Sequence, residues 1–232
     1  MKRICITNQK GGCGKTSTTV LLTLGLASSG NKVLAVDCDP QAGLTTFLLD
    51  NDKVNSGIFD LLTGGIAEPI QINRGGICFD LLPADHRLDK IYSTLSPFEL
   101  EKHFKKTPYD IIIFDTPPTV QGISRAAAII ADKILIPADI SRATISPTLY
   151  TLESLKEIKK TGKVYLLGKE PEKNKHGFVA QTTREFLKSI GMMYGGTIAK
   201  SVAMQRAVSG GLKWTATRID KILKPILETV KI

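Results

Sequence analysis

Near the start of the chain, glycines, lysines and hydroxyl groups follow one another at a spacing that suits phosphate binding. The segment reads Asn8-Gln9-Lys10-Gly11-Gly12-Cys13-Gly14-Lys15-Thr16-Ser17. Glycines let successive backbone N–H groups face an anion, and the N-terminus of a following helix adds its dipole. In such a loop Lys15 would reach the β- and γ-phosphates of a nucleotide, and the Thr16 hydroxyl would bind Mg²⁺. The predicted nucleotide-binding residues are Lys10, Gly11, Gly12, Cys13, Gly14, Lys15, Thr16 and Ser17.

Acidic residues follow two later apolar runs. One run ends in Val36-Asp37-Cys38-Asp39-Pro40-Gln41 and the other in Phe114-Asp115-Thr116-Pro117-Pro118. A carboxylate that ends a buried strand beside a phosphate loop is the Walker B arrangement, which holds Mg²⁺ directly or through water. A lone carboxylate there would be costly to bury without a cation or hydrogen-bond partners. We therefore expect Asp115 at a metal site, while Asp37 and Asp39 either point to the same side or splay where their strand turns.

Short apolar runs alternate with helical patterns and supply the elements that must position these groups. Six runs are apolar throughout, as in the interior of a parallel sheet. They are Arg3–Thr7, Lys32–Val36, Ile77–Leu82, Asp110–Phe114, Lys133–Pro137 and Lys163–Leu167. Helical spacing covers Thr16–Ala27, Ser124–Ala131, Ser146–Lys159 and Ala180–Ser189. This alternation predicts an α/β fold, a mostly parallel twisted β-sheet with helices on both faces, whose ligand site lies beyond the carboxyl ends of the strands.

The length and the charge distribution indicate how the chain is organised into domains. It has 232 residues, of which 31 are basic and 22 acidic, and its formal net charge is +9. It contains no linker-like segment and no repeat, so we expect a single domain over residues 1–232. Residues 1–149 hold 15 basic and 15 acidic residues, while residues 150–232 hold 16 and 7. This basic C-terminal third predicts a polyanion or an anionic surface as partner, unless it is only a solvated face.

The cysteines and the hydropathy pattern bear on the compartment. Cys5, Cys13, Cys38 and Cys78 form no C-x-x-C pair, so buried thiols in a reducing cytoplasm are the plain interpretation. Residues 1–8 hold no signal-peptide stretch, and no apolar run approaches the roughly 18 residues of a membrane span. We therefore expect a soluble, cytoplasmic protein.

The phosphate loop departs from the ordinary G-x-x-x-x-G-K-[ST] pattern. Gln9 stands where glycine is usual, and Lys10 adds a second lysine. Lys-Gly-Gly-x-Gly-Lys-Thr is the deviant Walker A signature of P-loop NTPases. Together with the two acidic segments, it makes the chain resemble the ParA/MinD superfamily of partition and positioning ATPases. The resemblance runs from Met1 to about Pro137, continues more loosely to the end, and is greatest to small ParA proteins that lack an N-terminal helix-turn-helix.

The resemblance implies a Mg²⁺-dependent ATPase, with ATP and Mg²⁺ as cofactors, and assigns roles to its charged residues. Lys10 would reach the ATP of the partner subunit in a sandwich homodimer, where a cation neutralises charge on the transferring phosphoryl group. Asp39 would position the attacking water, and Asp37 would support Mg²⁺ and switch I. The implied catalytic residues are Lys10, Lys15 and Asp39, and the implied metal-site residues are Thr16, Asp37 and Asp115.

The resemblance also gives the basic C-terminal third a function. In that family it binds DNA without sequence preference, as a continuous surface formed in the ATP-bound homodimer. The candidates here are Arg184, Lys188, Lys200, Arg206 and Lys213. Hydrolysis stimulated by a centromere-binding, ParB-like adaptor would release the DNA, which implies plasmid or chromosome partition at the nucleoid. The family's usual Pro-Arg-Asn is replaced by Ala199-Lys200-Ser201, so no residue is assigned to the adenine base.

Two other classes share the deviant loop. A MinD-type positioning ATPase would lay the amphipathic segment 218–232 on a membrane, but Asp220, Pro225 and Glu228 disfavour this, and a terminal helix packed on the body explains the same apolar stripe. Membrane binding is therefore not expected. Iron–sulfur carriers need paired or bridging cysteines, which the positions of the four cysteines do not provide. The cargo could equally be a protein assembly on the nucleoid.

Overall fold

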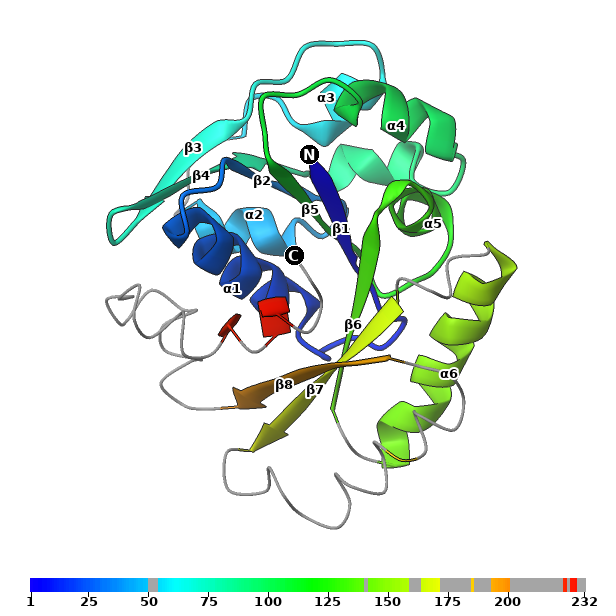
Figure 1. Ribbon diagram of the computed structural model, residues 1–232. Helices are drawn as coiled ribbons and strands as arrows, with labels where there is room; N and C mark the ends of the chain where they lie inside the picture. Colours follow the sequence, from blue (N-terminus) through cyan, green and yellow to red (C-terminus); the bar gives the residue numbers. More distant parts are fainter. Residues whose placement is uncertain are drawn as a thin grey trace.

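The computed structural model describes residues 1–49, 54–139, 142–158, 164–171, 185, 193–200, 223–224 and 226–228. In this part of the chain eight strands form one sheet, with helices on both of its faces (Figure 1). The strands are β1 (Lys2–Ile6), β2 (Val33–Asp37), β3 (Ile70–Arg74), β4 (Ile77–Leu82), β5 (Ile111–Asp115), β6 (Lys133–Asp139), β7 (Val164–Pro171) and β8 (Met193–Lys200). The helices are α1 (Lys15–Ser28), α2 (Gly43–Leu48), α3 (Ile58–Leu62), α4 (Pro97–Phe104), α5 (Gly122–Ile130), α6 (Arg142–Glu157) and the short 3₁₀ helix η1 (His86–Lys90).

The strand order brings three strand ends together. It runs β3-β4-β2-β5-β1-β6-β7-β8, so that β5 lies between β1 and β2. Neighbouring strands are parallel except for β3 and β4, which form an antiparallel hairpin. In this register Asp115 lies opposite Ile6 on one side and opposite Asp37 on the other. The carboxyl ends of β1, β5 and β2 therefore meet at one place, where doubly wound sheets bind their ligands.

Two hydrophobic cores cover the two faces of the sheet. On one face α1 and α2 contribute Leu21 and Leu44, and on the other α4 and α5 contribute Phe104 and Ile123. Phe104 also meets Phe114 of β5 edge to face, with ring centroids 5.2 Å apart. Strands β2 and β5 are buried along their whole length, which is why their sequences are apolar throughout rather than alternating. The predicted α/β class with a mostly parallel sheet is confirmed.

The last described residues pack on the same face as α1. Leu223 and Ile226 are 0% and 1% exposed and belong to the core that contains α1, whereas Lys224 and Glu228 are exposed. At Leu223 and Ile226 the apolar stripe of the terminal segment therefore packs against the body of the protein. This agrees with the expectation of a packed terminal helix rather than a membrane-bound one. Across the described residues, no helix has the length and hydropathy needed to cross a membrane.

Most predicted elements are present, with some differences. All six predicted strands occur, and β6 and β7 extend further than expected. Three of the four predicted helices occur, although α6 begins at Arg142 rather than Ser146. The prediction for 180–189 falls outside the described residues except at Glu185, which is helical. Strands β3 and β8, helices α2 to α4 and η1 were not predicted.

Candidate nucleotide and metal site

The phosphate loop connects β1 to α1, as the sequence predicted. Gly12 and Gly14 have φ angles of 69° and 86°, in the left-handed region that residues with a Cβ rarely adopt. Gly14 is the N-cap of α1, and Lys15, Thr16 and Ser17 form its first turn. A Cβ on Gly12 would meet nothing within 4 Å. The glycines therefore serve the backbone turn and leave the approach to the backbone N–H groups open.

Lys15 points into the loop. Its side chain is 8% exposed, and its Nζ donates to the carbonyl oxygens of Asn8 at 3.1 Å and Lys10 at 3.2 Å. Asn8 fixes the same turn, because its Nδ2 donates to the Pro137 carbonyl at 2.8 Å and its Oδ1 accepts the Lys10 N–H at 3.0 Å. The ammonium is thus held at the centre of the loop. The sequence predicted the role of Lys15 but not that of Asn8, which attaches the loop to β6.

Asp115 ends β5 beside the first turns of α1. Its Oδ2 accepts a hydrogen bond from Thr16 Oγ1 at 2.8 Å, and its Oδ1 accepts one from Thr19 Oγ1 at 2.9 Å. Burial raises the pKa of Asp115 to about 7, and the charge of Asp37 adds to this effect, while the two threonines and Lys15 oppose it. Thr16 and Asp115 therefore lie together as their motifs predicted. Thr19 was not predicted, because a threonine on a buried helix face is ordinary and only the tertiary structure places its hydroxyl beside Asp115.

Asp37 and Asp39 lie in different environments. Asp37 ends β2 and is 0% exposed; its Oδ1 accepts the Asp39 N–H at 3.0 Å, and its Oδ2 accepts both the N–H and the hydroxyl of Thr45 at 2.8 Å. Burial raises the pKa of Asp37 to about 6 despite these hydrogen bonds. Asp39 is half-buried, and its Oδ1 accepts the Gln41 N–H at 2.9 Å. Asp37 is therefore enclosed by hydrogen bonds inside the fold, whereas Asp39 lies partly at the surface.

The donor set at these strand ends fits Mg²⁺. Asp37 and Asp115 are directly opposite each other on β2 and β5, and neighbouring strands in a sheet are about 4.8 Å apart. Thr16 adds a hydroxyl to the two carboxylates. Mg²⁺ prefers such hard oxygen donors and is held in phosphate sites by one or two carboxylates together with phosphate oxygens. The described residues contain no group of three or more His, Cys, Asp or Glu side chains that could hold an ion. Thr16, Asp37 and Asp115 are thus the side chains of this region whose oxygen atoms fit Mg²⁺ in a phosphate site.

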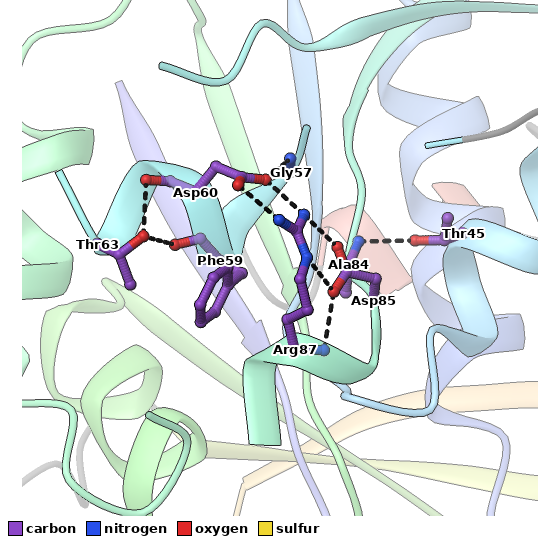
Figure 2. A network of polar contacts seen from close by, with 8 residues as sticks. All are labelled: Thr45, Gly57, Phe59, Asp60, Thr63, Ala84, Asp85 and Arg87. Carbon is purple, nitrogen blue, oxygen red and sulfur yellow. Dashed lines mark hydrogen bonds and ion pairs between the residues drawn. The ribbon is translucent and has the colours of Figure 1, made fainter. Parts of the chain in front are cut away.

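A second group of polar contacts, next to Asp37, joins Thr45 to the segment that follows β4 (Figure 2). Thr45 Oγ1 accepts the Ala84 N–H at 2.9 Å, in the segment that follows β4. Next to Ala84, the Arg87 guanidinium donates to both carboxylate oxygens of Asp60 at 2.8 and 2.7 Å and to both of Asp85 at 2.9 and 2.7 Å. This group of contacts ties α2, α3 and η1 to the end of β4. It was not predicted, because the contacts of Arg87 with Asp60 and of Ala84 with Thr45 join residues 27 and 39 positions apart.

The cysteines are not arranged as ligands of a cluster. Cys5, Cys13 and Cys38 are buried in β1, in the phosphate loop and just after β2, while Cys78 is exposed on β4. Burial raises the pKa of the Cys5 and Cys38 thiols. In the described part of the chain these cysteines belong to no group of three or more side chains that could hold a metal ion.

The other predicted site residues divide into two groups. Lys10 is half-buried in the phosphate loop. Of the five basic residues proposed to bind DNA, only Lys200 is described, at the end of β8. The other four lie outside the described residues; they are Arg184, Lys188, Arg206 and Lys213. All five stay predictions.

Comparison with known sequences gives two results. Residues 1–166 match a family model described as an AAA domain. The chromosome-partitioning ATPase Soj of Thermus thermophilus is 30% identical over 167 residues, which cover 68% of this chain and 63% of that protein. The chain spans about three fifths of the length of the curated relatives that it matches first.

Comparison with solved structures agrees with this assignment. A variant of Cyanothece McdA in complex with ATP has a TM-score of 0.83 at 22% identity, covering 100% of this chain and 97% of that one. A putative plasmid partition protein of Borrelia burgdorferi bound to AMPPNP has a TM-score of 0.80 at 22% identity, covering 100% and 99%. At these identities the likeness shows the fold, and the family model covers more than half of the chain. The chain therefore belongs to the AAA-domain family.

Proposed function

We propose that this chain is a Mg²⁺-dependent ATPase for DNA partition that dimerises when it binds ATP. The observation that carries the proposal is the 2.8 Å hydrogen bond from Thr16 Oγ1 to Asp115 Oδ2, with Asp37 adjacent on β2. It joins a phosphate loop to a pair of carboxylates, which are the parts that phosphoryl transfer needs. The similar structures with ATP and AMPPNP support ATP as the nucleotide.

The residues of the site act by binding and orientation. The loop N–H groups and Lys15 bind the phosphates, and Lys15 exchanges two backbone carbonyls for phosphate oxygens as it does so. Thr16, Asp37 and Asp115 would hold Mg²⁺, which supplies charge neutralisation to the phosphoryl group when it is bound. Asp39 is half-buried two residues after β2, and in this proposal its carboxylate orients the attacking water. Lys10 reaches the nucleotide of the partner subunit and stabilises charge during transfer.

The basic C-terminal third completes the proposed cycle. Two copies of this surface come together in the ATP-bound dimer, and their combined charge binds DNA phosphates at the nucleoid without sequence preference. A ParB-like adaptor at a centromere then stimulates hydrolysis, and the separated subunits release the DNA. The similarity to a chromosome-partitioning ATPase supports DNA as the cargo. A protein assembly moved on the nucleoid is the alternative cargo. A MinD-type membrane role has less support, because Leu223 and Ile226 are buried in the core.

DNA retention by the purified protein tests this function. Binding should require ATP and Mg²⁺, and log K should fall with log salt concentration with a slope of about −4 to −5, for some four to six neutralised phosphates. Liposomes in a parallel co-sedimentation should not bind. DNA binding that is equally strong without nucleotide, or ATP-dependent binding to liposomes alone, would contradict the proposal.

Neutralising the basic residues provides a matched comparison. The triple variant Lys188→Gln, Lys200→Gln and Arg206→Gln should remove most of the salt slope, because the three charges are lost from both subunits of the dimer. A control triple variant removes the same charge elsewhere, at exposed lysines in and after α4. Its substitutions are Lys102→Gln, Lys105→Gln and Lys106→Gln. An equal loss of DNA affinity in the two triple variants would show that binding depends on net charge and not on the C-terminal surface.

A further inference from the structure

We propose that Thr45 is a positioning residue for hydrolysis, which sets the orientation of the Asp37 carboxylate and, through it, the backbone of Asp39. This inference rests on the proposed ATPase function. Thr45 lies on α2, a helix of six residues without a side-chain cap at its N-terminus, and it is 5% exposed. Its polar groups are directed toward Asp37, at the end of β2, rather than toward solvent.

The hydroxyl proton of Thr45 has only one direction open to it. The Ala84 N–H donates to Thr45 Oγ1 at 2.9 Å and so occupies one of the hydroxyl's acceptor positions (Figure 2). The same Oγ1 lies 2.8 Å from Asp37 Oδ2, and an ionised carboxylate can only accept. The proton of Thr45 therefore points at Asp37. The backbone of the segment after β4 thus decides which way this hydroxyl donates.

Thr45 restricts Asp37 through two hydrogen bonds to one oxygen. Its N–H and its hydroxyl both donate to Oδ2 at 2.8 Å. A carboxylate has about four acceptor positions, so these two bonds use both positions on Oδ2, and the Asp39 N–H uses one on Oδ1 at 3.0 Å. Among the described residues no further donor reaches Asp37. One position on Oδ1 is therefore left for the metal site, and Thr45 fixes where it points.

The same contacts connect α2 to both sides of the site. The start of α2 lies beside the proposed metal ligand Thr16, since a Cβ on Gly43 would be 3.8 Å from Thr16 Oγ1. On the other side, Asp37 holds the N–H of Asp39. Without the Thr45 hydroxyl, a fully buried carboxylate would lose one of three donors, and the Ala84 N–H would lose its partner. Both the binding of Mg²⁺ and the placement of Asp39 should then suffer.

Two pairs of residues at position 45 isolate the hydroxyl. Thr and Val differ mainly in the hydroxyl, and Ser and Ala differ in the same way without the methyl group. We expect Thr45→Val and Thr45→Ala to raise the half-saturating Mg²⁺ concentration by about 10-fold or more, measured both for ATP hydrolysis and for the Mg²⁺-dependent part of ADP binding. Thr45→Ser should stay close to the wild type, because it keeps the donor. ADP binding in EDTA and the melting temperature show whether each variant is folded.

Thr46→Val is the control on the same helix, because its side chain is exposed, and it should leave both Mg²⁺ curves unchanged. The inference is overturned if the wild type hydrolyses ATP and all four residues at position 45 need the same Mg²⁺ concentration. It is also overturned if Ser behaves like Ala, since the methyl group and not the hydroxyl would then be what matters. A wild-type protein that binds and hydrolyses no ATP would instead refute the proposed function.

Discussion

Asp39 differs from the other carboxylates of the site in that it can be replaced without opening a buried network. It is half-buried, and its Oδ1 accepts the Gln41 N–H, a contact within the same turn. Asp39→Ala should therefore keep ATP binding and stability, while hydrolysis falls by about 100-fold because the attacking water loses its acceptor. Single-turnover hydrolysis and equilibrium ATP binding measure the two effects separately. Hydrolysis at the wild-type rate would show that Asp39 does not position the water.

At this scale the sequence predicted the residues that belong to short motifs. Lys15, Thr16 and Asp115 could be assigned because loop spacing and strand ends fix their places. Thr19 and Thr45 could not, since a threonine on a buried helix face is ordinary and only tertiary contact turns its hydroxyl toward a carboxylate. The sequence also left the relation of Asp37 to Asp39 open, because it depends on where β2 ends.

At the scale of the elements, Arg87 makes a polar connection between α3 and η1 that the sequence did not predict. Its guanidinium, 32% exposed, bridges Asp60 of α3 and Asp85 before η1 and lowers the pKa of both carboxyls from 3.8. The stabilisation is therefore fully present above pH about 4 and is lost as the pH falls through the lowered pKa values. Arg87→Met should cost about 1–2 kcal/mol near pH 7, and the difference from the wild type should shrink below pH 4.

Urea denaturation across this pH range measures the effect of Arg87→Met. Arg125→Met is the matched control, because its contact with Glu157 is 3.6 Å long and the two side chains are 43% and 71% exposed. That substitution should cost less than about 0.5 kcal/mol. A cost for Arg87→Met that stays constant down to pH 2.5 would show that packing, and not the carboxylates, explains it.

The start of α5 depends on a glycine. Gly122 has a φ of 52°, and a Cβ there would lie 2.0 Å from the Tyr92 carbonyl oxygen, which accepts the Ile123 N–H at 3.0 Å. Gly122→Ala should therefore lower the free energy of unfolding by about 2–4 kcal/mol, through backbone strain and overlap together. Gly64→Ala tests backbone strain alone, because Gly64 has a φ of 87° and open space around it. This substitution should lower the free energy of unfolding by about 1 kcal/mol. If urea denaturation gave the same loss of stability for Gly122→Ala and Gly64→Ala, overlap with the Tyr92 carbonyl would not be the cause.

The elements that were missed fall into two kinds. Some had a local signal: Gly75 and Gly76 both have positive φ in the turn between β3 and β4, and a Gly-Gly pair between strands is a hairpin signature. Ser96 and Glu99 likewise form the capping box of α4. Helix α2 had none, because it has six residues and no side-chain cap, and Thr45 anchors it to Asp37. Its existence depends on tertiary contacts that a local pattern does not contain.

For the whole molecule, two apolar residues near the C-terminus, Leu223 and Ile226, are part of the core. Leu223→Ala or Ile226→Ala should lower the free energy of unfolding by about 2–5 kcal/mol, because each side chain is nearly inaccessible and lies in the cluster with α1. Lys224→Ala, an exposed neighbour, should change it by less than about 0.5 kcal/mol. Calorimetric melting provides the comparison. Unchanged stability in both apolar variants would mean that the terminal segment does not contribute to the core.

The fold class was predictable as a whole because buried parallel strands are apolar on both faces, so their runs stand out from the helices between them. The order of the strands was not, because nothing local states that β5 lies between β1 and β2. That order is what places Asp37 beside Asp115. Short motifs could therefore indicate candidate residues one by one, while the neighbourhood of the carboxylates required the structure.

The distribution of the four cysteines also makes the protein convenient to label. Cys5, Cys13 and Cys38 are buried, and burial keeps the thiols of Cys5 and Cys38 protonated, whereas reagents such as maleimides react with accessible thiolates. Cys78 is exposed near the amino end of β4, at the opposite end of the sheet from the candidate nucleotide site. A dye should attach there in one-to-one stoichiometry without any engineered cysteine. Energy transfer between two labelled copies could then follow dimer formation while the phosphate loop stays unmodified.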